Sequence, residues 1–213
     1  MIFNKRILNF FSWLGLFSIQ IFFSIFSQDT LIKLIILSTY MISTSILWIK
    51  CIEKKNIRDR LDLQLRNFQF LIYTVVLSVV FLYTKDNFGT ASLIFGGSIL
   101  LPIIEELFFR CYLLGSVIDD WPNFNTLPRG ERRSFIKRAI KPLLLTSVSF
   151  ALVHNDVIYL VINGKIDFML FVLIIIRVIF GWAVGGIYIL KKNISMPSIL
   201  HIFFNITYYI FNP

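Results

Sequence analysis

A small set of polar and ionisable side chains lies within segments that are otherwise apolar. The set comprises Glu105, Glu106, Arg110, His154, Asp156, Arg177, His201 and Asn205. A charged group inside a membrane segment is costly unless it is paired or hydrated, so each of these residues needs a partner or a function. Both histidines of the chain belong to the set, and their joint occurrence favours a shared site over separate core residues.

Helical spacing assigns neighbours to several of these side chains. Glu106 and Arg110 are four residues apart, so they share a helix face and are expected to form an ion pair. Glu105 points about 100° away from Glu106 and is left to face another segment. Asp156 and Arg177 have similar expected depths, and we predict that they pair with each other. Glu105 is then the carboxylate to which no cation is assigned.

Three side chains are expected at one depth in the bilayer. At about 1.5 Å per residue, Glu105, His154 and Asn205 lie roughly 15–20 Å from the cytoplasmic ends of their segments. His201 lies somewhat shallower. A carboxylate and an imidazole that reach one water can deliver a hydroxide nucleophile, the general-base step of amide hydrolysis. A second imidazole with a carboxamide can donate hydrogen bonds to the oxyanion that forms. These residues therefore predict a hydrolytic site, with Glu106 supporting it rather than reacting.

The segments that must position these residues are long and apolar. Of the 213 residues, 57% are hydrophobic and 16% are aromatic, which is typical of a membrane protein. Apolar runs of spanning length occur at about 7–27, 31–49, 68–84, 92–118, 142–162, 167–190 and 196–211. We expect an all-α fold, a polytopic transmembrane bundle of about seven helices in one membrane domain over residues 1–213. The bundle has eight helices if the segment with Pro102 or the glycine-bearing segment divides.

Two helix starts are marked in the sequence. Pro142 suits the first turn of a helix over 142–162, and Ser195 is expected to cap the last helix. The connections at about 50–67 and 119–141 are charged, and the first of them has an amphipathic pattern that suits either an interfacial helix or a solvated loop.

The net charge of +9 follows the expected membrane topology. With a cytoplasmic N-terminus, most basic residues fall on the inside, in the stretches 5–6, 50–66, 129–141 and 191–192. This positive-inside pattern explains the charge, and no nucleic-acid motif or nucleic-acid partner is indicated. We expect an integral, multi-pass membrane protein. Its richness in Ile, Phe, Lys and Asn indicates an AT-rich genome and hence a bacterial plasma membrane.

Three short motifs in order along the chain resemble a known family. They are "EELFFR" with Glu105, Glu106 and Arg110, "FALVH" with Phe150 and His154, and "HIFFN" with His201 and Asn205. Together they resemble the motifs of the CAAX protease and bacteriocin-processing (CPBP, or Abi) family, which includes the type II CAAX prenyl endopeptidases, intramembrane glutamic proteases. The resemblance covers about residues 92–211, which would form the catalytic helical core.

The resemblance implies roles for the motif residues. It implies water activation by Glu105 and His154, an oxyanion hole from His201 and Asn205, and organisation of the site by Glu106 with Arg110. The implied activity is an intramembrane endopeptidase that cleaves near the C-terminus of a protein or in a membrane-associated peptide. Its implied partners are the lipid bilayer and a peptide or a prenylated or lipidated protein C-terminus as substrate.

Two alternatives remain open at this point. No cofactor is expected, but zinc held by the glutamates and histidines is an alternative that the absence of an HExxH motif and the cationic Arg110 disfavour. Buried Glu and His residues also serve as proton relays. A non-proteolytic membrane protein of the same fold, such as an immunity or partner-binding protein or an ion or proton carrier, is therefore the alternative function.

Overall fold

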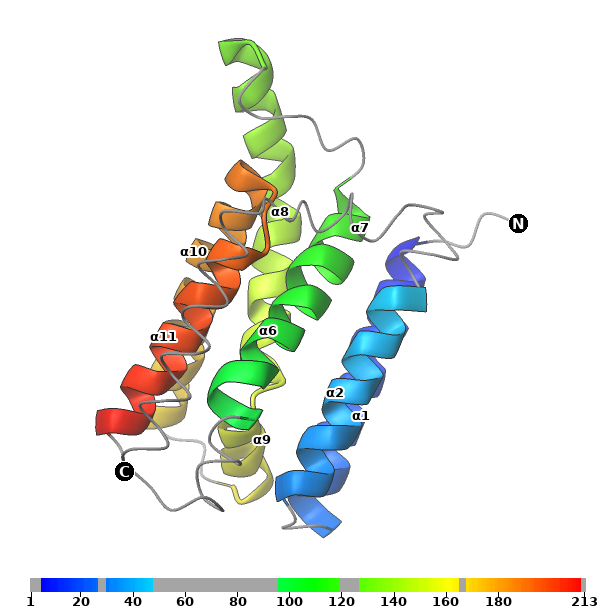
Figure 1. Ribbon diagram of the computed structural model, residues 1–213, viewed down its shortest axis with the longest axis vertical. Helices are drawn as coiled ribbons and strands as arrows, with labels where there is room; N and C mark the ends of the chain where they lie inside the picture. The colour runs from blue at the N-terminus through cyan, green and yellow to red at the C-terminus, as the bar shows by residue number, and fades with distance from the viewer. Residues whose placement is uncertain (1–4, 27–29, 48–95, 119–126, 165–167, 212–213) are drawn as a thin grey trace. The chain divides into compact units, whose positions relative to one another are not determined.

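The computed structural model describes residues 5–26, 30–47, 96–118, 127–164 and 168–211, and all secondary structure in these ranges is helical (Figure 1). The all-α prediction is confirmed for this part of the chain. Within it, two helices are long and apolar enough to cross a membrane, at Ile7–Phe26 and Phe168–Lys191, and Ile32–Leu47 is a shorter apolar helix. The predicted span 68–84 and the amphipathic pattern before it lie outside the described residues, so the total of seven or eight spans stays a prediction.

The chain forms two compact units, which we describe separately. The first unit contains Met1–Gln28 and Tyr112–Lys191, and the second contains Asp29–Cys111 and Lys192–Pro213. That the whole chain is one membrane domain stays a prediction.

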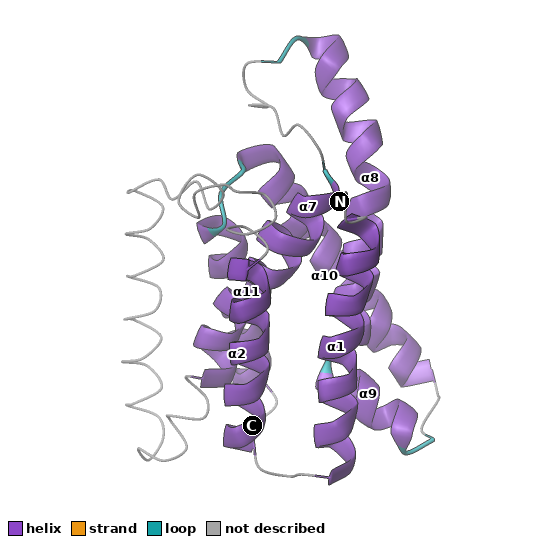
Figure 2. Ribbon diagram, turned by 90° about the vertical axis from the view of Figure 1, so that its right-hand side faces the viewer, coloured by secondary structure: helices purple, strands orange, loops and turns teal. Residues whose placement is uncertain are grey.

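Among the described residues, the first unit contains five α-helices and the end of the helical stretch Leu107–Leu114. The α-helices are α1 (Lys5–Phe26), α7 (Gly115–Val117), α8 (Arg129–Leu152), α9 (Asn155–Ile162) and α10 (Phe168–Lys191). α10 packs against α8 and α9, and α1 contacts α7 and α9 (Figure 2). Polar groups also link distant parts of the unit. The Tyr112 hydroxyl donates a hydrogen bond to Ser12 Oγ at 2.6 Å, and both residues are buried.

The helix start predicted at Pro142 is wrong, because α8 begins at Arg129 and carries this proline in its interior. A buried stripe explains why the helix extends past it. Phe135, Ala139 and Leu143 are buried at helical spacing, so the packed face of α8 continues across the proline. The residues preceding Pro142 therefore form a helix, whereas the sequence predicted a charged connection.

The predicted span 142–162 is also not one continuous helix. α8 ends at Leu152 and α9 begins at Asn155, so the chain turns at Val153 and His154. By contrast, the division predicted as an option for the glycine-bearing segment does not occur, because α10 is helical throughout from Phe168 to Lys191.

Close packing of α8 and α10 depends on a glycine. A Cβ atom at Gly181 would lie 3.3 Å from the Cα of Ser147 and 3.3 Å from a ring carbon of Phe150. Ser147 is fully buried, and its hydroxyl donates to the carbonyl of Leu143 at 2.7 Å. Small residues at helix interfaces allow backbones to approach closely inside membranes, and Gly181 has this role here.

We expect Gly181→Ala to lower the free energy of unfolding by about 1–3 kcal/mol, because the added methyl group would press on the backbone of α8. Gly186→Ala is the matched control, since a Cβ at Gly186 meets nothing within 4 Å. Denaturant unfolding of both purified variants in detergent measures the difference. Equal stabilities would contradict this account of the α8–α10 contact.

The second unit contains α2 (Thr30–Leu47), η2 (Gly96–Leu100), α6 (Leu101–Glu106), the start of η3 (Leu107–Leu114) and α11 (Ser195–Phe211). η2 and η3 are π-helical, a wider turn that in proteins often marks functional sites. α6 packs against α2 and α11 (Figure 1). Pro102 does not break the chain, because the helical residues continue without a gap from η2 into α6, and the proline directly follows the π-helical turn. The division predicted there as an option is absent.

The start of α11 is fixed by a buried hydrogen-bond network. The side-chain oxygen of Asn193 accepts a hydrogen bond from the Ser195 N–H at 2.8 Å. The carbonyl of Ile194 accepts from the Ser198 N–H and the Ser198 hydroxyl, both at 3.0 Å. The cap predicted at Ser195 is therefore wrong by two residues: Ser195 begins the helix, but Asn193 supplies the capping oxygen. All four residues are buried.

Candidate active site

Glu106 and Arg110 form the predicted ion pair. Arg110 Nε lies 3.0 Å from Glu106 Oε2, and both side chains are 0% exposed. The two residues are one helical turn apart, so the backbone itself brings them together. A buried charge pair of this kind is costly to desolvate and needs further hydrogen bonds to be tolerated.

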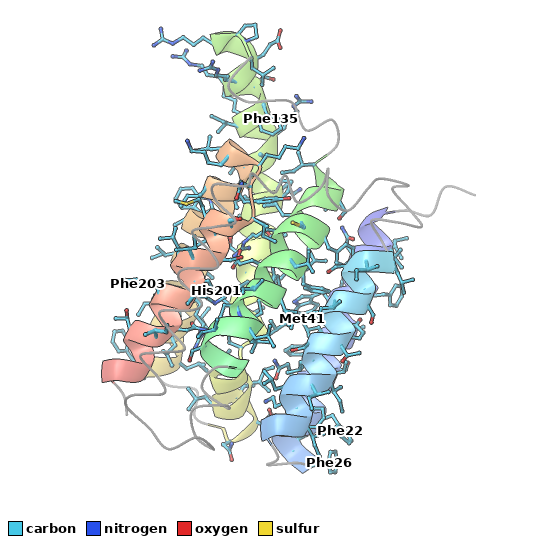
Figure 3. The ribbon with its side chains drawn as sticks, viewed as in Figure 1. Phe22, Phe26, Met41, Phe135, His201 and Phe203 are labelled. Carbon is cyan, nitrogen blue, oxygen red and sulfur yellow. The ribbon has the colours of Figure 1, made fainter. Side chains whose placement is uncertain are left out.

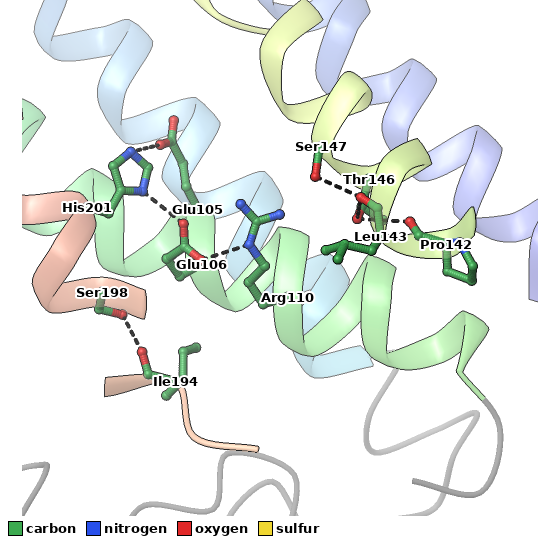
Figure 4. A network of polar contacts seen from close by, with 10 residues as sticks. All are labelled: Glu105, Glu106, Arg110, Pro142, Leu143, Thr146, Ser147, Ile194, Ser198 and His201. Carbon is green, nitrogen blue, oxygen red and sulfur yellow. Dashed lines mark hydrogen bonds and ion pairs between the residues drawn. The ribbon is translucent and has the colours of Figure 1, made fainter. Parts of the chain in front are cut away.

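α11 supplies a further hydrogen bond through His201. Its Nδ1 lies 2.9 Å from Glu106 Oε1, and its Nε2 lies 3.5 Å from Glu105 Oε2 (Figure 4). Because the carboxylate paired with Arg110 is an acceptor, the Nδ1–H of His201 donates to it. His201 is buried, whereas Phe203, two residues later, is 68% exposed and lies on the outer side of α11 (Figure 3).

The two glutamates differ in their access to solvent. The side chain of Glu105 is 13% exposed, while that of Glu106 is 0% exposed. Glu106 is held by both Arg110 and His201. Glu105 faces the other nitrogen of His201 and is the more solvent-accessible of the two carboxylates. This accessibility suits a group that must bind and activate water.

Sequence reasoning missed the contact between His201 and Glu106. It assigned His201 to the oxyanion hole beside Asn205 and gave Glu106 only Arg110 as a partner. The two residues are 95 positions apart, so no helical spacing relates them. Asn205 lies one turn after His201 on α11 and is half-buried, and its oxyanion role stays a prediction.

His154 belongs to the first unit and lies where α8 gives way to α9. Its Nδ1 is 2.7 Å from the carbonyl oxygen of Phe150, and the two rings meet edge to face with centroids 4.4 Å apart. A carbonyl only accepts hydrogen bonds, so Nδ1 carries the proton and the neutral ring has its lone pair on Nε2. The backbone carbonyl of His154 in turn accepts from the Ile158 N–H at 3.0 Å, which starts α9.

This geometry fixes the tautomer of His154 but not its partner in the site. The carbonyl of Phe150 is one of the last four of α8, which lack helical donors, so the imidazole satisfies it. Because His154 and Glu105 lie in different units, their meeting at one water stays a prediction. The side chain of Asp156 lies outside the described residues, and its pairing with Arg177 also stays a prediction.

Comparison with known proteins identifies the class to which the chain belongs. A family model described as type II CAAX prenyl endopeptidase Rce1-like matches residues 87–207. The match covers more than half of the chain and includes all six predicted site residues. Comparisons with curated proteins and with solved structures gave no match.

The protein is therefore a membrane-embedded CAAX-type protease, a hydrolase. The chain belongs to the type II CAAX prenyl endopeptidase Rce1-like family. This family acts on the C-termini of prenylated proteins. The resemblance deduced from the three motifs is thus confirmed, and its range of 92–211 nearly coincides with the matched residues.

Proposed function

We propose that this protein is an intramembrane endopeptidase of the glutamic type. In this proposal Glu105 acts with His154 as the general base that removes a proton from water. The oxygen of that water attacks the carbonyl carbon of the scissile peptide bond. The observation that supports this assignment best is the difference between the two carboxylates: Glu106 is fully buried and doubly held, whereas Glu105 is 13% exposed.

Glu106 and Arg110 would position His201 rather than react. Glu106 accepts from Nδ1 and so turns Nε2 of His201 toward Glu105. For Nε2–H to donate to an oxyanion, the imidazole must carry both of its protons. Two cations, Arg110 and His201, would then balance the two carboxylates, which is favourable in a site with little water. The proton on the base finally passes to the leaving amine, which completes hydrolysis of the bond.

The amide of Asn205 is proposed as the second oxyanion donor. We expect Asn205→Ala to slow turnover by on the order of 10²–10³-fold while leaving the fold intact, because one stabilising hydrogen bond to the transition state is lost. Thr207→Ala is the control, since the Thr207 hydroxyl is used by its own helix, donating to the carbonyl of Phe203 at 2.8 Å. An unchanged rate in Asn205→Ala would contradict the assigned role.

The substrate is proposed to be a peptide in or at the membrane, with a prenylated or lipidated C-terminus as the first candidate. The purified protein would be incubated with a peptide library that includes lipidated C-termini, with and without a chelator, beside Glu105→Gln. We expect cleavage that the chelator leaves unchanged and that the variant lacks. Loss of cleavage with chelator and its return with zinc would identify a zinc site instead. Proton flux across liposomes that depends on Glu105, without cleavage, would favour a carrier.

We also propose a multi-pass topology with a cytoplasmic N-terminus in a bacterial plasma membrane. The basic first half of α8 would then lie on the cytoplasmic side, as the positive-inside rule requires.

A further inference from the structure

A cavity of about 680 Å³ lies in the first unit, between α1, α8 and the chain from Leu113 to Val117. It contains none of the six residues assigned to hydrolysis. Its side-chain composition changes along its length, and this change indicates what the cavity can hold.

One face of α8 forms a long wall of the cavity. The residues on this face, three or four positions apart, are Arg138, Lys141, Leu145, Ser149 and Leu152. The wall is cationic at one end and largely apolar at the other. Over these residues the helix rises by about 21 Å, somewhat more than the ~15 Å of one leaflet of hydrocarbon. A molecule with an anionic head and an apolar tail fits this order.

α1 forms the opposite wall with aromatic side chains. Trp13 donates from its indole N–H to the carbonyl of Ser149 at 3.2 Å, which links α1 to α8. Trp13 also stacks on Phe17, with centroids 5.2 Å apart and planes within 12°. The indole is therefore held in place, and with Phe10 it offers apolar surface to the cavity.

Asn9 also lines the cavity, and its side chain is held in place by a hydrogen bond. Asn9 donates from Nδ2 to Ser116 Oγ at 2.6 Å, and the residue is only 8% exposed. Its side-chain oxygen is buried and has no hydrogen-bond partner among the described residues. The hydrogen bond to Ser116 joins α1 to α7, and the buried oxygen itself is not exposed to the cavity.

The surroundings of the cationic end add to its attraction for an anion. Arg138 and Lys141 are both exposed, and the same half of α8 carries four more basic residues against one acidic residue, Glu131. Such basic segments next to a membrane attract anionic lipid headgroups.

We propose that this cavity binds an anionic glycerophospholipid. The phosphate would lie at Arg138 and Lys141, and an acyl chain would lie against Phe10 and Trp13. The bound lipid would fill the space between α1 and α8. This proposal rests on the chain being embedded in a membrane and is independent of the residues assigned to hydrolysis.

Quenching of Trp13 by brominated lipid tests the proposal. A variant that keeps Trp13 alone, with Trp48, Trp121 and Trp182 replaced by Phe, is reconstituted into phosphatidylcholine vesicles. These contain increasing fractions of brominated phosphatidylglycerol or of brominated phosphatidylcholine. We expect brominated phosphatidylglycerol to quench Trp13 at a lower mole fraction than brominated phosphatidylcholine does. Replacing Arg138 and Lys141 by Gln should weaken its apparent affinity roughly thirtyfold, equivalent to about 1 kcal/mol for each basic side chain.

The matched control replaces Arg133 and Lys137 by Gln. It removes the same charge from the same helix, but these residues do not line the cavity. We expect it to keep the preference for the anionic lipid. Equal quenching by the two brominated lipids would overturn the proposal. Equal loss of preference in both double variants would also overturn it, because surface charge alone would then explain the binding. Trp13 emission in vesicles without bromine checks that each variant is folded.

Discussion

Replacing Glu105 by glutamine is expected to lower the rate of peptide hydrolysis by on the order of 10⁴-fold, the upper end of what a positioned general base contributes. Glutamine has nearly the same shape as glutamate but takes no proton from water. The substitution removes a partly exposed group, 3.5 Å from His201, so the fold should persist. Initial rates on the best peptide of the library, with unfolding of both proteins as the control for stability, measure the effect. A rate within a few-fold of wild type would exclude Glu105 as the base.

The same assay tests whether His154 acts on the same water. His154→Ala alone should slow hydrolysis to a similar extent. If both residues serve one proton transfer, the double variant should be about as slow as either single variant, because groups that act as a unit are strongly non-additive. Effects that multiply would show that the two residues act separately. This comparison therefore tests whether Glu105 and His154, which belong to different units, act on the same water.

The spacing of residues along the sequence predicted the contacts that form within a single helix. The Glu106–Arg110 pair follows from a separation of four residues within a helical segment, and the structure has it at 3.0 Å. Predicting this pair requires no knowledge of how segments pack.

Features that depend on packing could not be predicted from spacing. The contact of His201 with Glu106 joins α11 to α6, and the sequence carries no signal for the register between them. The start of α8 was misplaced because the burial of Phe135 and Ala139 outweighs the preference of proline for a first turn. The break at His154 coincides with the polar run from His154 to Asp156, but the prediction treated His154 and Asp156 as site residues within one span, not as a helix boundary.

The second large expected effect is the loss of folding stability when Arg110 is replaced. We expect Arg110→Met to lower the free energy of unfolding by about 3–5 kcal/mol, because it leaves the Glu106 carboxylate buried without its cation. Both side chains are fully buried, so water cannot take the place of the guanidinium. Denaturant titration in detergent, followed by circular dichroism, measures the loss. Lys137→Met, at an exposed position of α8, is the control and should change stability by less than about 0.5 kcal/mol.

A double variant separates loss of the charge balance from loss of packing. Glu106→Gln combined with Arg110→Met removes both charges, and the glutamine oxygen can still accept from His201 Nδ1. We expect it to be more stable than Arg110→Met alone, since replacing a whole buried pair is often nearly neutral whereas breaking one is not. If the double variant is no more stable than the single one, the lost volume and contacts of Arg110, rather than the unpaired charge of Glu106, account for the destabilisation.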